Sequence, residues 1–213
     1  MIDLHTHSLL SDGELLPSEL VRRAEVIGYR AIAITDHSDA SNIDFVIERI
    51  VNDCNELKAA IPVIPGVELT HIPPSQIGLM VKKARDLGAR LVLVHGETVV
   101  EPVSQGTNRA AIEAGVDILA HPGLLTPEDA MLAAEKGVCL ELTARKGHSL
   151  SNGHVASVAK KIGVDMVLNT DTHSPSDIIS DDMAVRIVVG AGLTEGDFRV
   201  ITKNAEKILQ RIL

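Results

Sequence analysis

The stretch DLHTHSLLSDGE, residues 3–14, places His5 and His7 two positions apart directly after a short apolar run. Side chains two positions apart on a strand leave the same face, so both imidazoles can bind one metal ion. The SDG that follows adds a carboxylate, Asp12, five positions after His7. The stretch therefore predicts a first strand, IDLH at 2–5, with metal ligands at its carboxyl end.

Six further apolar runs of strand length follow this one. They are AIAITDH at 31–37, PVIPGVEL at 62–69, LVLVHG at 91–96, DILAHPG at 117–123, VCLELT at 138–143 and DMVLNTDTH at 165–173. Segments with helical spacing lie between them, including 17–28, 77–88, 127–137 and 155–163, and a closing helix is expected over 195–213. Apolar strands that alternate with helices predict a parallel sheet covered by helices. Seven strands indicate an α/β fold, a (β/α)7 TIM-like barrel, with an open doubly wound sheet as the structural alternative.

Composition sets limits on the class of protein. The 213 residues are 45% apolar and 23% charged, which predicts one domain over 1–213 with no membrane span and no secretory signal, in the cytoplasm. A formal charge of −9, with no Trp, one Tyr and two Phe, makes nucleic acid an unlikely partner. Bound divalent cations would still give such a chain a locally positive pocket for an anion.

Each of the seven runs ends in residues that can bind a metal. These are His5 and His7, Asp36 and His37, Glu68, His95, His121, Glu141, and Asp171 with His173. The carboxyl ends of parallel barrel strands lie on one face, so we expect these side chains to meet there. A single buried histidine is more often a hydrogen-bonded core residue than a metal ligand. Chance, however, does not readily place His, Asp or Glu at the same end of all seven strands, and burying such groups without partners would be costly.

In this order, DLHTHSLLSDG, ITDH, GVE, VHG, AHP and NTDTH resemble the polymerase and histidinol phosphatase (PHP) family from residue 3 to about residue 173. The resemblance implies a distorted seven-stranded barrel with a centre of up to three metal ions. It implies three ligand sets: His5, His7, Glu68 and Asp171; Glu68, His95 and His121, with Glu68 bridging; and His37, His173 and Asp12. Some members of the family carry histidine at the position of Asp12. These nitrogen and oxygen ligands fit two to three divalent ions of zinc, manganese, iron or cobalt.

The segment ELTARKGHSLSNGH, residues 141–154, supplies candidates for substrate binding. Arg145 and Lys146 suit the free oxygens of a phosphate, and the alternative is a solvated loop. His148, His154 and His71 are further candidates near the mouth of the site. Asp36 is expected to orient a ligand histidine, and Glu141 to line the floor of the site.

We therefore predict a metal-dependent phosphoric ester hydrolase, most simply a histidinol-phosphatase-like phosphomonoesterase acting on a small phosphorylated metabolite. Glu68 and Asp171 would hold ions that share an attacking hydroxide, Arg145 would stabilise the phosphate oxygens, and His148 or His154 would protonate the leaving alcohol.

Three alternatives stay open. One is a phosphodiesterase or exonuclease acting on nucleotides or nucleic acid, and another is a non-catalytic metal-binding regulatory module. An amidohydrolase-type barrel also opens with HxH, but such barrels commonly use a lysine at the fourth strand end, where this chain has His95. The substrate, the metals and the oligomeric state do not follow from the sequence.

Overall fold

A computed structural model describes all residues from 1 to 213. The strands are β1 (Ile2–Asp3), β2 (Ala31–Ile34), β3 (His37–Ser38), β4 (Val63–Leu69), β5 (Leu91–His95), β6 (Ile118–Ala120), β7 (Cys139–Thr143) and β8 (Met166–Asn169). The α-helices are α1 (Pro17–Ile27), α2 (Ile43–Glu56), α3 (Pro74–Asp86), α4 (Thr107–Glu113), α5 (Pro127–Lys136), α6 (Asn152–Ile162), α7 (Asp181–Gly190) and α8 (Glu195–Ile212). Two short 3₁₀ helices, η1 (His148–Ser151) and η2 (Pro175–Asp177), follow β7 and β8.

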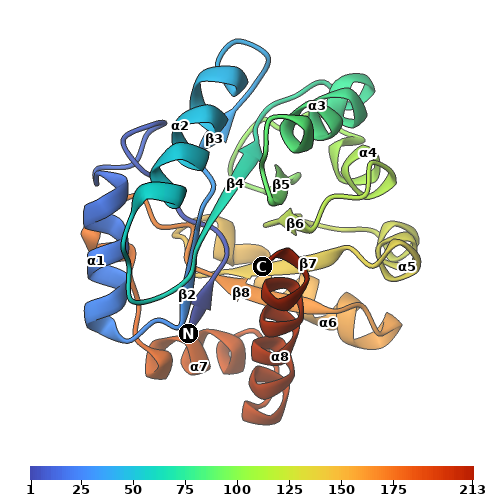
Figure 1. Ribbon diagram of the computed structural model, residues 1–213. Coiled ribbons are helices and arrows are strands. Elements are labelled where there is room, and N and C mark those ends of the chain that lie inside the picture. The colour runs from blue at the N-terminus through green and yellow to red at the C-terminus, as the bar shows by residue number, and fades with distance from the viewer.

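Seven strands form a parallel sheet in the order β1-β2-β4-β5-β6-β7-β8. The two-residue β3 also pairs with β4, so it continues the second predicted run beyond β2. The first and last strands meet beyond their carboxyl ends, where Thr6 bridges to Thr172 and the His7 N–H donates to the Thr172 carbonyl at 2.8 Å. The sheet is a nearly closed barrel with helices around it (Figure 1), which confirms the predicted (β/α)7 TIM-like barrel.

The helices pack their apolar faces on the outside of the sheet. α1 begins at Pro17, which needs no amide hydrogen there, and ends before Gly28, whose φ of 92° lies in the left-handed region. The predicted closing helix is confirmed as α8, which begins with a capping box between Thr194 and Asp197. α2, α4 and α7 lie outside the segments that helical spacing predicts, and α2 ends in extended backbone at Leu57 instead of at a glycine.

α8 covers the amino-terminal end of the barrel. Its buried Ala205 and Ile208 pack with inward-facing residues of all seven strands of the barrel. Arg211 reaches the Asp117 carboxylate at 2.6 Å, beside the start of β6. The barrel interior is therefore apolar and closed at this end, and its buried polar side chains gather at the opposite end.

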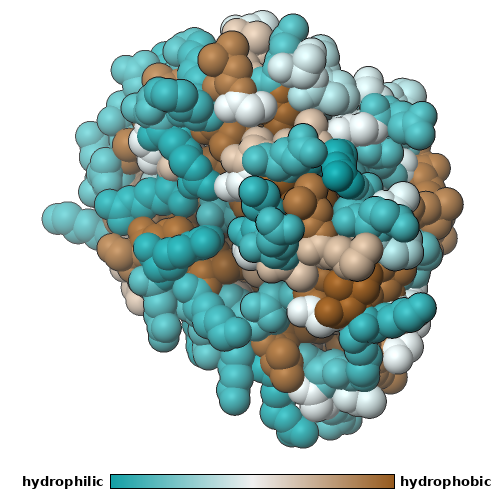
Figure 2. Space-filling model, turned by 90° about the vertical axis from the view of Figure 1, so that its right-hand side faces the viewer, coloured by the Kyte–Doolittle hydropathy of each residue, from teal (hydrophilic) through white to brown (hydrophobic).

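The outer surface is largely polar. On the side that carries α4 and α5, Figure 2 shows hydrophilic side chains with scattered hydrophobic patches between them. Leu124, just before α5, and Met131, within α5, are among the exposed apolar side chains. None of the helices combines the length and the apolar character that a membrane span requires.

Candidate metal centre

The nine predicted metal ligands come together at the carboxyl ends of the strands. They are His5 and His7 after β1, Asp12 in the next loop, His37 in β3, Glu68 in β4, His95 in β5, His121 after β6, and Asp171 and His173 after β8. Only His37 and Asp12 reach solvent appreciably, with side chains that are 24% and 58% exposed. The convergence follows from the parallel sheet, which directs every strand end to one face.

Glu68 lies at the middle of the inner cluster. Its Oε1 is 3.3 Å from His95 Nδ1 and 3.3 Å from His121 Nε2. Its Oε2 is 3.2 Å from His5 Nε2 and 3.5 Å from His7 Nε2. Oε2 is also 2.9 Å from His37 Nδ1, so the two oxygens face different sets of histidines, an arrangement suited to a carboxylate that bridges two ions.

Asp171 closes the inner cluster from the other side. Its Oδ1 is 3.2 Å from His7 Nε2, and its Oδ2 is 3.7 Å from His121 Nε2. His5 and His121 both lie beside the Glu68 and Asp171 carboxylates, so their rings are close together, with centroids 5.7 Å apart.

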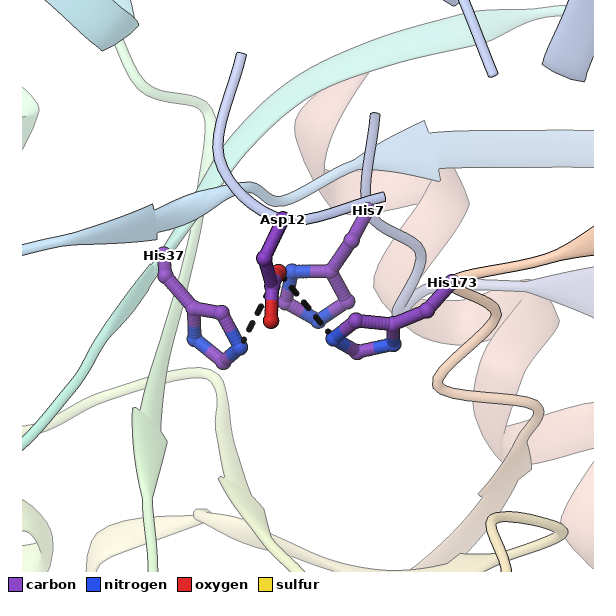
Figure 3. Close-up of side chains that lie close together, drawn as sticks. All are labelled: His7, Asp12, His37 and His173. Carbon is purple, nitrogen blue, oxygen red and sulfur yellow. Dashed lines mark ion pairs between the residues drawn. The ribbon is translucent and has the colours of Figure 1, made fainter. Parts of the chain in front are cut away.

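A second, outer cluster forms around Asp12 (Figure 3). The Asp12 Oδ1 atom is 3.2 Å from His173 Nε2 and 3.6 Å from His37 Nε2. His7 completes this group of four, and its ring stacks on His173 with centroids 4.1 Å apart. Gly13 makes the turn possible, because a Cβ there would lie 2.5 Å from the His7 carbonyl oxygen.

The side chains of the inner cluster lack partners. Eleven buried side-chain nitrogen and oxygen atoms have no hydrogen bond, and nine of them belong to six predicted ligands: His5, His7, Glu68, His95, His121 and Asp171. Such atoms are costly to bury unless something compensates them. Divalent cations would do so, and a donor set of nitrogen and oxygen without thiolate fits zinc, manganese, iron or cobalt.

The electrostatics of the cluster also favour positive charge. Burial raises the pKa of Glu68, but His5, His37 and His95 outweigh it and hold that pKa well below its usual range. Burial lowers the pKa of His95, but the Glu68 and Glu101 carboxylates outweigh it and raise the value to about 10. In the metal-free chain His95 is therefore protonated, and its positive charge lies where a metal cation would also be stabilised.

Hydrogen bonds orient several of these rings. His5 Nδ1 is 2.8 Å from Glu141 Oε1, which leaves Nε2 directed at Glu68. Glu141 therefore holds a predicted ligand from behind, at the floor of the site. Asp36 differs from expectation, since it accepts hydrogen bonds from Ser8 and Ser11 instead of contacting a ligand histidine, and so it fixes the loop that carries Asp12.

Backbone strain is confined to this end of the barrel. The three non-glycine residues with positive φ are His71 (52°), His121 (27°) and Asp171 (53°), and two of them are predicted ligands. Left-handed backbone is unfavourable for residues with a Cβ, and such strain is typical of functional sites.

The predicted substrate-binding residues divide into two groups. Arg145 is half-buried, and its Nη1 lies 3.4 Å from Asp177, whose carboxylate also accepts the His173 amide. Buried His148 stacks on His121 with centroids 4.2 Å apart, and exposed His71 lies 5.3 Å from the His95 ring.

Lys146 and His154 form no hydrogen bond or ion pair with the cluster. The Lys146 side chain is exposed and forms no hydrogen bond or ion pair. His154, on α6, is also exposed and bonds through Nε2 to the Leu125 carbonyl at 2.8 Å.

Glu101 was not among the residues predicted from the sequence. Its carboxylate Oε2 lies 3.1 Å from His95 Nε2, and the contact with His95 is the main cause that lowers the Glu101 pKa to about 2. Glu101 belongs to an irregular loop between β5 and α4 that also carries Glu97, and no periodicity distinguishes one acidic residue of a loop from another.

Comparison with known proteins places this site in a family. The chain is 51% identical to an uncharacterized protein of Methanocaldococcus jannaschii, over 99% of both chains. It is 30% identical to ribonuclease P protein component 3 of Methanosarcina barkeri, over 94% of this chain and 85% of that one. It is 29% identical to a probable phosphatase of Shewanella loihica, over 88% and 84%.

Solved structures share the fold. In the structure of archaeal ribonuclease P with mature tRNA, a chain with 21% identity superposes with a TM-score of 0.71, over 96% of this chain and 89% of that one. Histidinol phosphate phosphatase from Lactococcus lactis, solved with zinc, L-histidinol and phosphate, superposes with a TM-score of 0.60 at 19% identity, over 90% and 94%. The sequence profile described as the PHP domain matches residues 3–150. With that match, and with relatives at 30% and 51% identity along nearly its whole length, this chain belongs to the PHP domain family.

Proposed function

We propose that this chain is a metal-dependent phosphoesterase, and that it acts as a phosphomonoesterase on a small phosphorylated metabolite. The observation that carries the proposal is the position of buried Glu68, whose two carboxylate oxygens form no hydrogen bond and face different sets of histidines within 3.5 Å: His95 and His121 at Oε1, and His5, His7 and His37 at Oε2. Membership of the PHP family and the resemblance to a probable phosphatase support it.

The proposed ligand sets are those that the family resemblance implies, and each of the nine residues lies in at least one close group of potential ligands. His5, His7, Glu68 and Asp171 would hold one ion, Glu68, His95 and His121 a second, and Asp12, His37 and His173 a third. Divalent ions there would neutralise phosphate charge and lower the pKa of a coordinated water toward neutrality.

Protein groups at the rim would bind the substrate. Arg145 is oriented by Asp177, and its guanidinium suits two free phosphate oxygens. His148 Nδ1 lies 2.7 Å from the Thr98 hydroxyl, so that hydroxyl can donate to Nδ1 and leave an N–H at Nε2. That N–H lies 3.4 Å from Glu101 Oε1 and, with substrate bound, would donate a hydrogen bond to the oxygen of the leaving group. His71 would contact the substrate at the entrance, while Lys146 and His154 make no contact with the cluster and are not included.

RNA is the basis of a second candidate function. Ribonuclease P protein component 3 is a relative at 30% identity, and a chain of similar fold occurs in archaeal ribonuclease P with tRNA. These relatives weigh against the expectation that nucleic acid is an unlikely partner. They favour, as the alternative, a phosphodiesterase or exonuclease that acts on RNA, or a non-catalytic subunit.

The test combines metal content with substrate choice. The wild type and Glu68→Gln would be purified without added metal, analysed for metals, and assayed with an aryl phosphate, a bis-aryl phosphate and single-stranded RNA, with Lys146→Ala as the matched control. We expect bound metal in the wild type, hydrolysis of the monoester by the wild type and by Lys146→Ala, and loss of hydrolysis in Glu68→Gln. Cleavage of RNA or of the diester alone would replace the proposal with the second candidate, and full metal content without any hydrolysis would favour the non-catalytic module.

A further inference from the structure

The loop between β5 and α4 is held firmly at both of its ends. Glu97 Oε1 accepts the amide hydrogens of Gly106 at 3.0 Å and Asn108 at 2.9 Å, and the Asn108 side chain accepts the Glu97 amide at 2.9 Å. These bonds fix the base of the loop, so the position of Glu101 within it is set by the fold.

Glu101 contacts three imidazoles at the mouth of the centre. Its Oε2 is 3.1 Å from His95 Nε2 and 3.5 Å from His71 Nε2, and its Oε1 is 3.4 Å from His148 Nε2. The Glu101 side chain is 37% exposed, whereas His95 is 3% exposed. A single carboxylate therefore joins the buried β5 ligand to two histidines from other loops.

The orientation of the His95 ring gives this contact a role. Its Nδ1 lies 3.3 Å from Glu68 Oε1, and its Nε2 lies on the side of Glu101. A histidine that binds a metal through one nitrogen carries its proton on the other, and that N–H needs an acceptor. Glu141 meets the same need for His5, whose Nδ1 it contacts at 2.8 Å.

We propose that Glu101 is a positioning residue: once a metal ion is bound at Nδ1, the carboxylate, which lies 3.1 Å from His95 Nε2, accepts the Nε2–H and so holds Nδ1 toward the metal centre. Through His148, which stacks on His121, the same carboxylate steadies a second member of the set formed by Glu68, His95 and His121. The inference rests on the proposed metal centre and adds to it a residue on a loop that contributes none of its ligands.

An ordinary surface ion pair would behave differently. Exposed pairs contribute little, so removing one changes neither metal affinity nor chemistry. Removing an acceptor from a ligand histidine typically weakens metal binding by about 10- to 100-fold. Metal affinity therefore separates the two roles.

The experiment compares Glu101→Ala and Glu101→Gln with the wild type. Glu113→Ala is the matched control, because Glu113 is an exposed glutamate of α4 that pairs only with Arg109. Binding of Zn²⁺ and Co²⁺ to metal-free protein would be measured by competition with a chromophoric chelator, with the visible spectrum of bound Co²⁺ and the thermal stability of the metal-free chain as further readouts.

We expect Glu101→Ala to weaken one equivalent of metal by about 10- to 100-fold and to change the Co²⁺ spectrum. Glu101→Gln should recover part of the affinity, because its amide oxygen still accepts a hydrogen bond. In the phosphatase assay, kcat should fall more than KM changes. Wild-type affinity in Glu101→Ala, or an equal loss in Glu113→Ala, would overturn the proposal.

The two proposals fail in different ways. If Glu101→Ala loses metal affinity but the wild type hydrolyses no phosphate ester, the positioning role stands and the proposed function falls. A wild type that binds no metal would overturn both.

Discussion

Removing divalent metal should lower the thermal stability of this chain strongly. Nine buried ligand atoms have no hydrogen-bond partner, so the metal-free state carries uncompensated polar groups inside the barrel end. One ion at a free concentration about 100 times its Kd stabilises the folded state by about 2.7 kcal/mol. For a chain of this length each kcal/mol corresponds to about 2–4 °C in Tm, so one ion accounts for about 5–11 °C.

The assay is differential scanning calorimetry with zinc or manganese and, separately, with a chelator. Glu68→Gln should lose most of the metal-dependent shift, since Glu68 faces both inner pairs of histidines. Asp12→Asn should lose only a part, because Asp12 contacts the outer cluster alone and its side chain is 58% exposed. Equal Tm values with metal and with chelator in the wild type would refute the reasoning from the unpartnered atoms.

Three further predictions test other parts of the molecule. Ile208→Ala should destabilise the chain by about 2–5 kcal/mol in urea unfolding, because the side chain is buried where α8 covers the barrel, and a change below about 1 kcal/mol would contradict that packing. Arg145→Ala should reduce kcat/KM on a phosphate monoester by about 10- to 100-fold, the worth of a hydrogen bond to a charged group, while Lys146→Ala should stay within about twofold; equal losses would reject the assigned difference. Metal affinity should increase from about pH 6 to about pH 8. The neighbouring carboxylates raise the His95 pKa to about 10, so His95 is protonated over this range and a metal ion must displace that proton. A calorimetric titration that shows no such increase would count against ligation by His95.

The strand ends were predictable because two local signals coincide there. A buried parallel strand is an uninterrupted apolar run, and a polar residue at its end, such as Glu68 or His95, is conspicuous against it. The convergence of these polar residues on one face therefore follows from the sequence as soon as the sheet is known to be parallel, whereas their division into ligand sets rests on the family resemblance.

Loop geometry was not predictable in the same way. Glu101 acquires its contacts only when three separate loops meet. Arg145 and Lys146 are neighbours in the chain, but only Arg145 lies within reach of the Asp177 carboxylate. His154 likewise lies on α6, where its hydrogen bond to the Leu125 carbonyl decides its direction. These are tertiary contacts, and no spacing in the chain encodes them.

The contact between β1 and β8 has a consequence for the order in which the chain folds and binds metal. Leu4 and Asn169, 165 positions apart, are hydrogen-bonded at this seam, and His5 and Asp171 lie beside it. Bringing such distant segments together is slow, because the entropy of closing the loop is lost before any contact forms. A nascent chain therefore lacks Asp171, and with it the proposed set of His5, His7, Glu68 and Asp171, until its last strand has docked. Binding of that proposed ion would then be a late event in biogenesis, one that stabilises a barrel already assembled instead of guiding its assembly.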